Sequence, residues 1–249
     1  MNDAAVRSAT IRRFSRWRIA EHWLCAAVVI ALAATGLAQR FNSNDFCQWL
    51  VLQLGGIENA RLVHRLCALL LSVLLVAHIA VAAVGMALKK WKPHMMISRK
   101  DFADLVTNLK FYMGTIDNPA QCDRYCYNQK FEYWAIIIGL VLMAVTGFVL
   151  WFPTDITRFL PGEIIPAAKA LHTNEAVLIF LLVALWHVYN AMFSPEVFPL
   201  DTSIFTGRIS VERMAHEHPL ELTRLHAHDA SAEPISKTSS VNRQGREER

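Results

Sequence analysis

The stretch that decides the fold is RLVHRLCALLLSVLLVAHIAVAAVGMAL, residues 61–88. From Leu66 onward it is apolar except for Ser72 and His78, and it contains no proline. A helix rises about 1.5 Å per residue, so about 20 apolar residues cross a bilayer core of about 30 Å. The run is also too long for a strand, which has typically about 5–6 residues. This stretch therefore predicts a transmembrane helix.

Three more stretches flank it and have the same character, at about 19–40, 131–152 and 170–193. The whole chain of 249 residues is 54% hydrophobic and 18% charged, and its mean hydropathy is +0.27. An average soluble domain has about 25% charged residues. This composition excludes disordered, collagen-like and disulfide-scaffold proteins for most of the chain. The predicted fold class is all-α, an integral membrane four-helix bundle.

The positions of Lys and Arg predict how this bundle is oriented. All but five of the 25 lie before the second turn of the first helix, in the 89–130 loop or after the fourth helix. The positive-inside rule then places both termini and this loop in the cytoplasm, and the bundle in the bacterial cytoplasmic (inner) membrane. The net charge of +4 reflects this topology, and no nucleic-acid motif is present. The first helix is expected to be retained, because no small-x-small signal cleavage site follows it.

The domain organisation follows from the spans. Residues 1–18 are expected to form a cytoplasmic N-terminus, 19–195 the four-helix domain and 196–249 a cytoplasmic tail, disordered after about residue 229. The histidine-rich segment 207–228 predicts a surface or partner-docking helix rather than a metal site. The positive charge of the 89–130 loop and the tail has two equally good interpretations. It docks a cytoplasmic subunit, or it is solvated and faces the lipid.

Cysteine use indicates no cofactor chemistry. Cys122 and Cys126 lie in the loop predicted to face the reducing cytoplasm, and the chain contains neither CxxC nor CxxCH. A zinc ribbon and covalently attached haem c are therefore not indicated. We expect all five cysteines to be unpaired small apolar or loop residues.

The sequence contains an internal repeat. The first and third predicted helices each carry a Trp that is followed twelve residues later by Thr-Gly. These residues are Trp23 with Thr35 and Gly36, and Trp134 with Thr146 and Gly147. The second and fourth helices each carry one His near the outer end and one further in. The pattern predicts a duplicated two-helix unit with both copies inserted the same way round.

The histidines at membrane depth are the candidate functional residues, because ionisable groups inside a bilayer are rare and usually functional. His64 and His78 are about 21 Å apart along a helix, and His172 and His187 about 22 Å. Each helix thus carries two imidazoles on a similar face, near opposite membrane surfaces. Two such helices can hold two stacked haems, each ligated from both sides by imidazole. His22 is a fifth histidine, near the inner end of the first helix.

Other residues fit such haems. Gly36 and Gly147 would let a porphyrin approach the helix backbone, because glycine has no side chain. Arg18, Arg61 and Arg65 lie at helix ends near candidate ligands, where guanidinium groups can pair with haem propionates.

These motifs resemble the membrane cytochrome b (gamma) subunit of respiratory formate dehydrogenases, and they are similar to those of the b-type cytochromes of nickel-iron hydrogenases and thiosulfate reductases. The resemblance covers roughly residues 10–215. It is carried by 18–23 with Thr35-Gly36, 61–65, 129–134 through Thr146-Gly147, Leu171-His172, 187–189 and 198–208.

The resemblance implies a subunit with two haem b groups that relays electrons between a redox partner and menaquinone or ubiquinone. It assigns His64 and His172 to the outer haem, and His22 and His187 to the inner haem, with quinone beside the inner haem. The implied partners are an iron–sulfur or multihaem cytochrome subunit and a catalytic subunit, together with quinone and membrane lipid.

The sequence departs from that family pattern at His78, which the pattern does not require. The internal duplication would pair His78 with His187, so His22 and His78 are alternatives for one inner ligand, and we favour His22. The alternative function is a haem-free membrane anchor or a proton or metal transporter that uses these histidines. Such a pathway would need intramembrane Asp or Glu, which the interiors of the second and third helices lack.

A second departure lies just before the third helix. The segment from Tyr125 to Asn128 replaces the Asn and Gly that the family tends to place near quinone. Tyr125, Asn128 and Lys130 are the residues that remain as candidates for a quinone site.

Overall fold

The computed structural model of the chain describes residues 9–195 and 197–232. The predicted transmembrane helices are confirmed as four helices long and apolar enough to span a membrane. They are α2 (Arg16–Arg40), α4 (Ile57–Ala87), α6 (Tyr127–Trp151) and the helix Ile164–Phe193, which begins with α8 (Ile164–Leu181). Each begins earlier than its apolar run, because polar residues continue the helix beyond the hydrocarbon region.

Local capping explains where two of the helices start. The side chain of Ser15 accepts a hydrogen bond from the backbone N–H of Arg18, so it caps an otherwise unsatisfied donor in the first turn of α2. α4 follows Gly55 and Gly56, whose φ angles are 83° and 103°. Only glycine adopts these conformations without strain, so the pair turns the chain directly into the helix.

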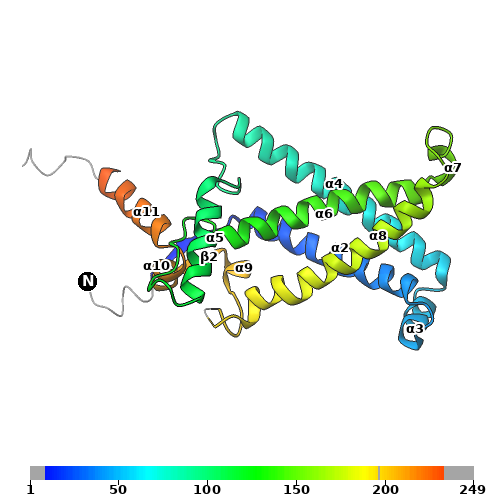
Figure 1. Cartoon of the computed structure of the whole chain (residues 1–249), viewed down its shortest axis with the longest axis horizontal. Helices are drawn as coiled ribbons and strands as arrows, with labels where there is room; N and C mark the ends of the chain where they lie inside the picture. The colour runs from blue at the N-terminus through cyan, green and yellow to red at the C-terminus, as the bar shows by residue number, and fades with distance from the viewer. Residues whose placement is uncertain (1–8, 196, 233–249) are drawn as a thin grey trace, which may run out of the picture. The chain divides into compact units, whose positions relative to one another are not determined.

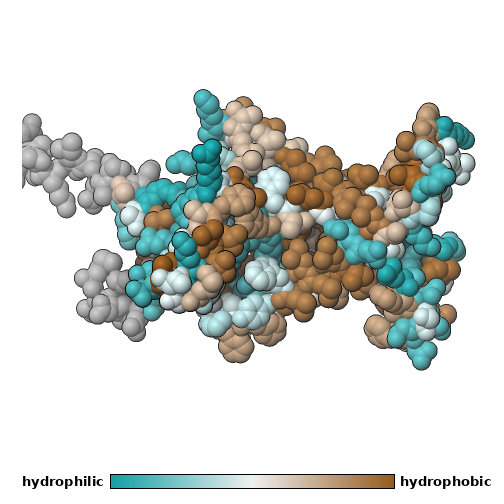
Figure 2. Space-filling view, in the orientation of Figure 1, coloured by the Kyte–Doolittle hydropathy of each residue, from teal (hydrophilic) through white to brown (hydrophobic). Residues whose placement is uncertain are grey.

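The outward faces of the four helices are apolar. Ile30 and Leu185 are each 69% exposed, and Figure 2 shows a mostly hydrophobic surface over these helices. A water-soluble protein rarely exposes so much contiguous apolar surface, whereas in a bilayer this surface contacts lipid. The chain is therefore a multi-pass membrane protein.

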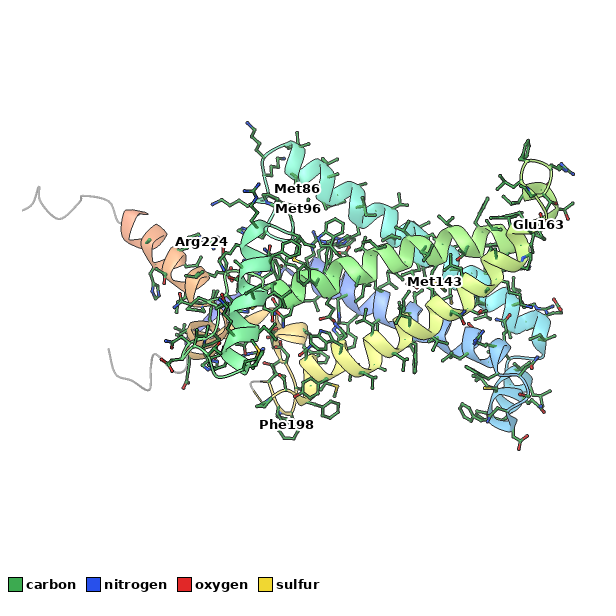
Figure 3. The ribbon with its side chains drawn as sticks, in the orientation of Figure 1. Met86, Met96, Met143, Glu163, Phe198 and Arg224 are labelled. Atoms are coloured by element: carbon green, nitrogen blue, oxygen red, sulfur yellow. A yellow bond between two sulfur atoms is a disulfide. The ribbon has the colours of Figure 1, made fainter. Side chains whose placement is uncertain are left out.

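Small residues let the helices approach each other. α2 packs against α4 and α8, and Ala38, Ala60 and Ala168 are buried. A Cβ added to Gly139 of α6 would lie 2.9 Å from Cδ1 of Ile179, so a larger residue there would require the Ile179 side chain to move. Side chains project from all four helices, with Met143 part-way along α6 (Figure 3).

The fourth helix changes its winding near its C-terminal end, which the predicted orientation places on the cytoplasmic side. After α8 it continues in wider π-type turns, η1 (Leu182–His187) and η2 (Tyr189–Phe193). Nothing in the sequence, such as a proline or glycine, signals this change. π-type turns are rare and are frequent at functional sites, and His187 is the last residue of η1.

Several short elements join or follow the spans. They are the helices α3 (Asp45–Gln53), α7 (Pro153–Ile156) and α9 (Ser203–Thr206), and the strands β1 (Thr10–Arg12) and β2 (Arg208–Ser210). The two strands form a two-stranded sheet. The all-α class is confirmed, and this small sheet is an addition that the sequence did not predict.

A second compact unit contains, within the described residues, 9–11, 98–127 and 210–232. Its helices are α5 (Arg99–Tyr112), α10 (Val211–Glu217) and α11 (Pro219–Ala232). The predicted surface helix is two helices, and His218 between them is buried and donates from Nδ1 to the carbonyl of Asp123 at 2.7 Å. The predicted disorder after residue 229 lies, beyond Ala232, outside the described residues.

An ion pair connects the loop before α6 to α11 inside this unit. Arg124 contacts the nearly buried Glu221 at 2.6 Å. Burial disfavours the charged guanidinium, but the charges of Tyr125 and Glu221 outweigh it and raise the pKa of Arg124. Arg124 therefore stays charged at any physiological pH.

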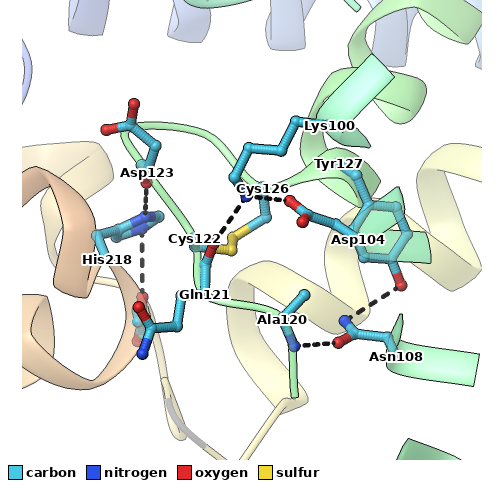
Figure 4. Close-up of a disulfide and its surroundings, with 11 residues drawn as sticks. Lys100, Asp104, Asn108, Ala120, Gln121, Cys122, Asp123, Cys126, Tyr127 and His218 are labelled. Carbon is cyan, nitrogen blue, oxygen red and sulfur yellow. Dashed lines mark hydrogen bonds and ion pairs between the residues drawn. A yellow bond between two sulfur atoms is a disulfide. The ribbon is translucent and has the colours of Figure 1, made fainter. Parts of the chain in front are cut away.

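The expectation of unpaired cysteines is wrong for two of the five. Cys122 and Cys126 form a disulfide with Cα atoms 5.0 Å apart (Figure 4). Asn108 of α5 accepts from the backbone N–H of Ala120, and Lys100 donates to the carbonyl of Gln121, so the chain before Cys122 is fixed. The turn that follows brings two cysteines four residues apart together, a pairing that a search for CxxC does not find.

The orientation can be tested by thiol labelling. In a background with Cys25 and Cys67 replaced by Ala, we expect a membrane-impermeant maleimide to label Cys47 in intact spheroplasts. Cys122 and Cys126 should react only after lysis and reduction, because the positive-inside rule places them in the cytoplasm. Labelling is read by mass spectrometry, with Cys47→Ser as control. Reaction of Cys122 in intact, reduced spheroplasts would reverse the orientation.

Candidate functional site

Two histidines face each other between the helices near one end of the four-helix unit. His64 of α4 and His172 of α8 have ring centroids 6.5 Å apart. Nδ1 of His64 lies 2.8 Å from Oγ1 of Thr35, and Nδ1 of His172 lies 2.9 Å from Oγ1 of Thr146. Each hydroxyl donates its own proton to the carbonyl four residues earlier, so it accepts from the imidazole. Both rings are thereby held with Nδ1 protonated and Nε2 as a bare lone pair.

Two glycines give these rings their room. A Cβ on Gly36 would lie 3.1 Å from Cε1 of His64, and a Cβ on Gly147 would lie 3.2 Å from Cε1 of His172. Both distances are tighter than an ordinary carbon contact. The Thr-Gly pairs of the repeat therefore act together, the threonine as hydrogen-bond partner and the glycine as space for the same ring.

A second facing pair consists of His22 of α2 and His187 of η1. Their ring centroids are 6.2 Å apart. Nδ1 of His187 donates to Oε1 of Glu132 at 2.7 Å, a partner that fixes the tautomer with Nε2 unprotonated. Among the described residues, neither Nε2 of His187 nor either nitrogen of His22 has a hydrogen-bond partner. This pair also presents nitrogen lone pairs to the space between the helices.

His78 of α4 is placed differently from the other four. Its Nδ1 lies 2.7 Å from Oε1 of Glu21, and its Nε2 lies 2.8 Å from the hydroxyl of Tyr133. Arg18 pairs with the other oxygen of Glu21 at 2.8 Å. Both ring nitrogens of His78 are thus engaged in hydrogen bonds with protein groups.

The contacts repeat between the two halves of the unit. Thr35 with His64 matches Thr146 with His172, and Glu21 with His78 matches Glu132 with His187. In this register His22 of α2 corresponds to Tyr133 of α6, both immediately after the matched glutamates. The contacts therefore show the duplication that the sequence predicts. One position differs between the halves, because the second half has Tyr133 where the first has His22.

The arginines expected near propionates have protein partners. Arg61 pairs with Glu58 at 2.6 Å, and the guanidinium of Arg65 stacks over the ring of Trp151 at 5.5 Å. Arg18, besides Glu21, stacks over Trp91 at 5.3 Å.

The quinone candidates are dispersed. Asn128 and Lys130 lie in the first turn of α6, and Tyr125 belongs to the second compact unit. Oδ1 of Asn128 is buried without a hydrogen-bond partner among the described residues. Such an atom is costly to bury without a partner, so its position needs an explanation.

The sequence reasoning missed Thr35, Thr146, Glu21, Glu132 and Tyr133 as members of the site. A signal existed, because Thr and Glu recur at the same spacing as the tryptophans of the repeat. The two glutamates and Tyr133 lie near the starts of their helices, and the two threonines lie in the Thr-Gly motifs. Only the fold shows which histidine each one contacts.

The donor set suits haem iron better than a bare metal ion. Within the described residues no group of three or more His, Cys, Asp or Glu could hold a metal ion. Haem iron needs only two axial protein ligands, and imidazole nitrogens at ordinary metal–nitrogen distances place the two ring centroids roughly 6 Å apart. The pairs at 6.2 and 6.5 Å fit this requirement. The fold and site thus have the features of a membrane cytochrome with axial histidines from facing helices.

Comparison with known proteins agrees with this class. Residues 13–206 match the family of prokaryotic cytochrome b561, and the chain belongs to that family. Its cofactor is accordingly haem b, and it carries out electron transfer. The predicted resemblance to membrane cytochrome b subunits is confirmed.

Individual relatives are subunits of formate dehydrogenases. The chain is similar to the formate dehydrogenase cytochrome b556(fdo) subunit of Escherichia coli K12, with 29% identity over 75% of this chain and 81% of the relative. It is 23% identical to the nitrate-inducible cytochrome b556(Fdn) subunit of the same organism, over 66% and 73%. It is 24% identical to the formate dehydrogenase cytochrome b556 subunit of Haemophilus influenzae, over 80% and 76%.

The glycine contacts give a direct test of the pair formed by His64 and His172. We expect Gly147→Val to lower the haem bound per chain, because its branched side chain would overlap the His172 ring, and overpacking costs about 1–3 kcal/mol. Haem is read from the α-band absorbance of the reduced, purified protein. Gly162→Val is the matched control, since nothing lies within 4 Å of a Cβ at Gly162. Equal haem content in the two variants would contradict the close approach.

Proposed function

We propose that this chain is the di-haem cytochrome b subunit of a formate dehydrogenase-type respiratory complex. It would relay electrons across the bacterial cytoplasmic membrane between a redox partner and the menaquinone or ubiquinone pool. The observation that carries this proposal is the presence of two facing imidazole pairs, one at each end of the helices, with open nitrogen lone pairs. The relatives named as cytochrome subunits of formate dehydrogenase support the type of complex.

His64 with His172 would hold the outer haem, and His22 with His187 the inner haem. His78 is the weaker candidate for the inner ligand because Glu21 and Tyr133 occupy both of its nitrogens. Ligation by His78 would require breaking the bond to Tyr133. His22 needs no such rearrangement, since no hydrogen bond of the described residues holds its ring.

The protein residues set the properties of these two positions. When bound, the haems supply one-electron carriers near the two membrane surfaces. Thr35 and Thr146 orient the outer imidazoles through neutral hydroxyls, whereas a carboxylate orients His187. Because a carboxylate makes imidazole a stronger donor, it stabilises ferric iron, so the inner position should have the lower potential for equal burial.

The quinone site is proposed at the cytoplasmic end of α6. Asn128 offers a buried amide oxygen that lacks a partner among the described residues, and a quinol hydroxyl can donate to it. Lys130 in the same turn of the helix is the second candidate. Uptake of protons here from the cytoplasm, with electrons entering from outside, would generate a proton-motive force. The reverse direction would oxidise quinol.

The partners are proposed from the same relatives. The described residues contain no cluster that could hold an iron–sulfur, nickel or molybdenum centre, so substrate oxidation would take place in a catalytic subunit. An iron–sulfur or multihaem cytochrome subunit would pass electrons to the outer haem. The competing proposal, a haem-free anchor or a proton or metal transporter, predicts a purified protein with no b-type α-band after dithionite reduction.

Haem counting tests the ligand assignment. Pyridine haemochrome analysis of the wild-type protein should give two haem b per chain. We expect one haem in His22→Ala, His64→Ala, His172→Ala and His187→Ala, and two haems in His78→Ala. Loss of a haem in His78→Ala together with two haems in His22→Ala would show that the inner assignment is wrong.

A second variant tests the quinone site. We expect Asn128→Leu to raise the KM for decylubiquinone about 3–10-fold, the effect of losing one hydrogen bond of about 0.5–1.5 kcal/mol. Haem content should stay unchanged. Asn174→Leu is the control, because Asn174 contacts Arg40 near the other end of the helices. An unchanged KM for Asn128→Leu would remove Asn128 from the site.

A further inference from the structure

The broken repeat leaves one interaction without a role in the proposed function, the hydrogen bond between Tyr133 and His78. His22 in the first half faces His187 as an open imidazole pair. Tyr133, its counterpart in the second half, faces His78 with 2.8 Å between hydroxyl and Nε2. In the second half, this position therefore holds a phenol that is hydrogen-bonded to an imidazole. In the first half, the equivalent position holds two facing imidazoles with no hydrogen bond between them.

The protons of this pair can be assigned from its contacts. Oε1 of Glu21 lies 2.7 Å from Nδ1 of His78, so Nδ1 carries the proton and donates it to the carboxylate. Arg18 holds the second oxygen of Glu21 at 2.8 Å and lies further, 3.3 Å, from Nδ1. Nε2 is then a bare lone pair that accepts the O–H of Tyr133. The imidazole is oriented as a base toward a phenol, the arrangement that carboxylate, imidazole and hydroxyl adopt in proton transfer.

The pair is shielded, and its tyrosine lies on the same helix as Asn128, about 140° further around the helix axis. The side chains of His78 and Glu21 are only 24% and 16% exposed. Tyr133 lies in the second turn of α6, about 7.5 Å along the helix from Asn128. Arg18, Glu21, His78 and Tyr133 come from three helices. Ionisable side chains inside a membrane protein are costly, so they pair with one another and usually mark a functional site.

We propose that Tyr133 and His78 exchange the proton that quinone takes up or quinol releases, an inference that rests on the proposed function. In quinol oxidation, a quinol O–H gives its proton to the oxygen of Tyr133 while the phenol proton moves to Nε2 of His78. The electron would pass to a haem held by His22 and His187, and the Glu21 carboxylate stabilises the imidazolium until it releases its proton to water. Quinone reduction runs the same step in reverse. Two passages complete the exchange of two electrons and two protons.

Glu21 and Arg18 are positioning residues in this scheme. Glu21 fixes the His78 tautomer that leaves Nε2 facing Tyr133, and Arg18 holds Glu21 in place. These two from α2 and Tyr133 from α6 are the titratable and charged groups in contact with His78.

The test uses the complete haem-loaded protein in nanodiscs and the variant Tyr133→Phe, which removes only the hydroxyl. Stopped-flow absorbance follows reoxidation of the dithionite-reduced haems by decylubiquinone. We expect about a tenfold or greater slowing, with haem content and both midpoint potentials unchanged. Redox-difference infrared spectra should lose the tyrosine and imidazole signals that accompany quinone reduction. His78→Ala should be slowed similarly and partly rescued by added imidazole.

The control is Tyr127→Phe, on the same helix, whose hydroxyl contacts the side chain of Asn108. It should reoxidise at the wild-type rate. A wild-type rate in Tyr133→Phe, or equal slowing in Tyr127→Phe, would overturn the relay and leave the proposed function standing. Loss of a haem in Tyr133→Phe or His78→Ala would also overturn it, because the pair would then be structural or ligating. Failure of decylubiquinone and menadione to oxidise the wild-type haems would overturn the proposed function itself.

Discussion

The structure depends on the requirement that an imidazole inside a membrane have a partner for its N–H. A polar group in hydrocarbon cannot turn to water, so a neighbouring helix must supply the acceptor. Thr35, Thr146, Glu21 and Glu132 do this for four histidines, each across a helix–helix contact. The same bonds that satisfy Nδ1 also fix where Nε2 points. Helix packing and the chemistry of the site are therefore one problem, solved by the same four residues.

Duplication explains why the solution appears twice. Each half contributes a helix with Glu near the start and Thr-Gly further on, and a helix with two histidines. Because both halves fold in the same way, the acceptors reach equivalent rings in each. Tyr133 in the second half takes the place of His22, and this exchange changes the chemistry of the contact. The imidazole of His22 has a nitrogen lone pair that can bind a metal, whereas the hydroxyl of Tyr133 forms a hydrogen bond with the facing His78.

Much of this protein could be predicted from its sequence. Four predicted helices, each with about 20 predominantly apolar residues, are long enough to cross a bilayer core of about 30 Å, so fold class and number of spans follow from hydropathy alone. The histidines stood out because ionisable residues in such runs are rare. The boundaries were less accurate, since Ser15 and the Gly55–Gly56 turn, not hydropathy, decide where α2 and α4 begin. The bond between Cys122 and Cys126 was missed because it depends on how the loop before α6 turns.

By itself, then, the sequence determined a four-helix membrane protein with a repeated pattern of histidines. It left His22 and His78 as alternatives for one inner ligand, with His22 favoured only by the family resemblance, because spacing along one helix says nothing about which residues lie opposite. Only the tertiary structure decided that His22 faces His187 while His78 faces Glu21 and Tyr133. The physical reason is that the protonation and freedom of an imidazole are set by atoms within hydrogen-bond distance, and here these atoms come from helices far apart in the chain.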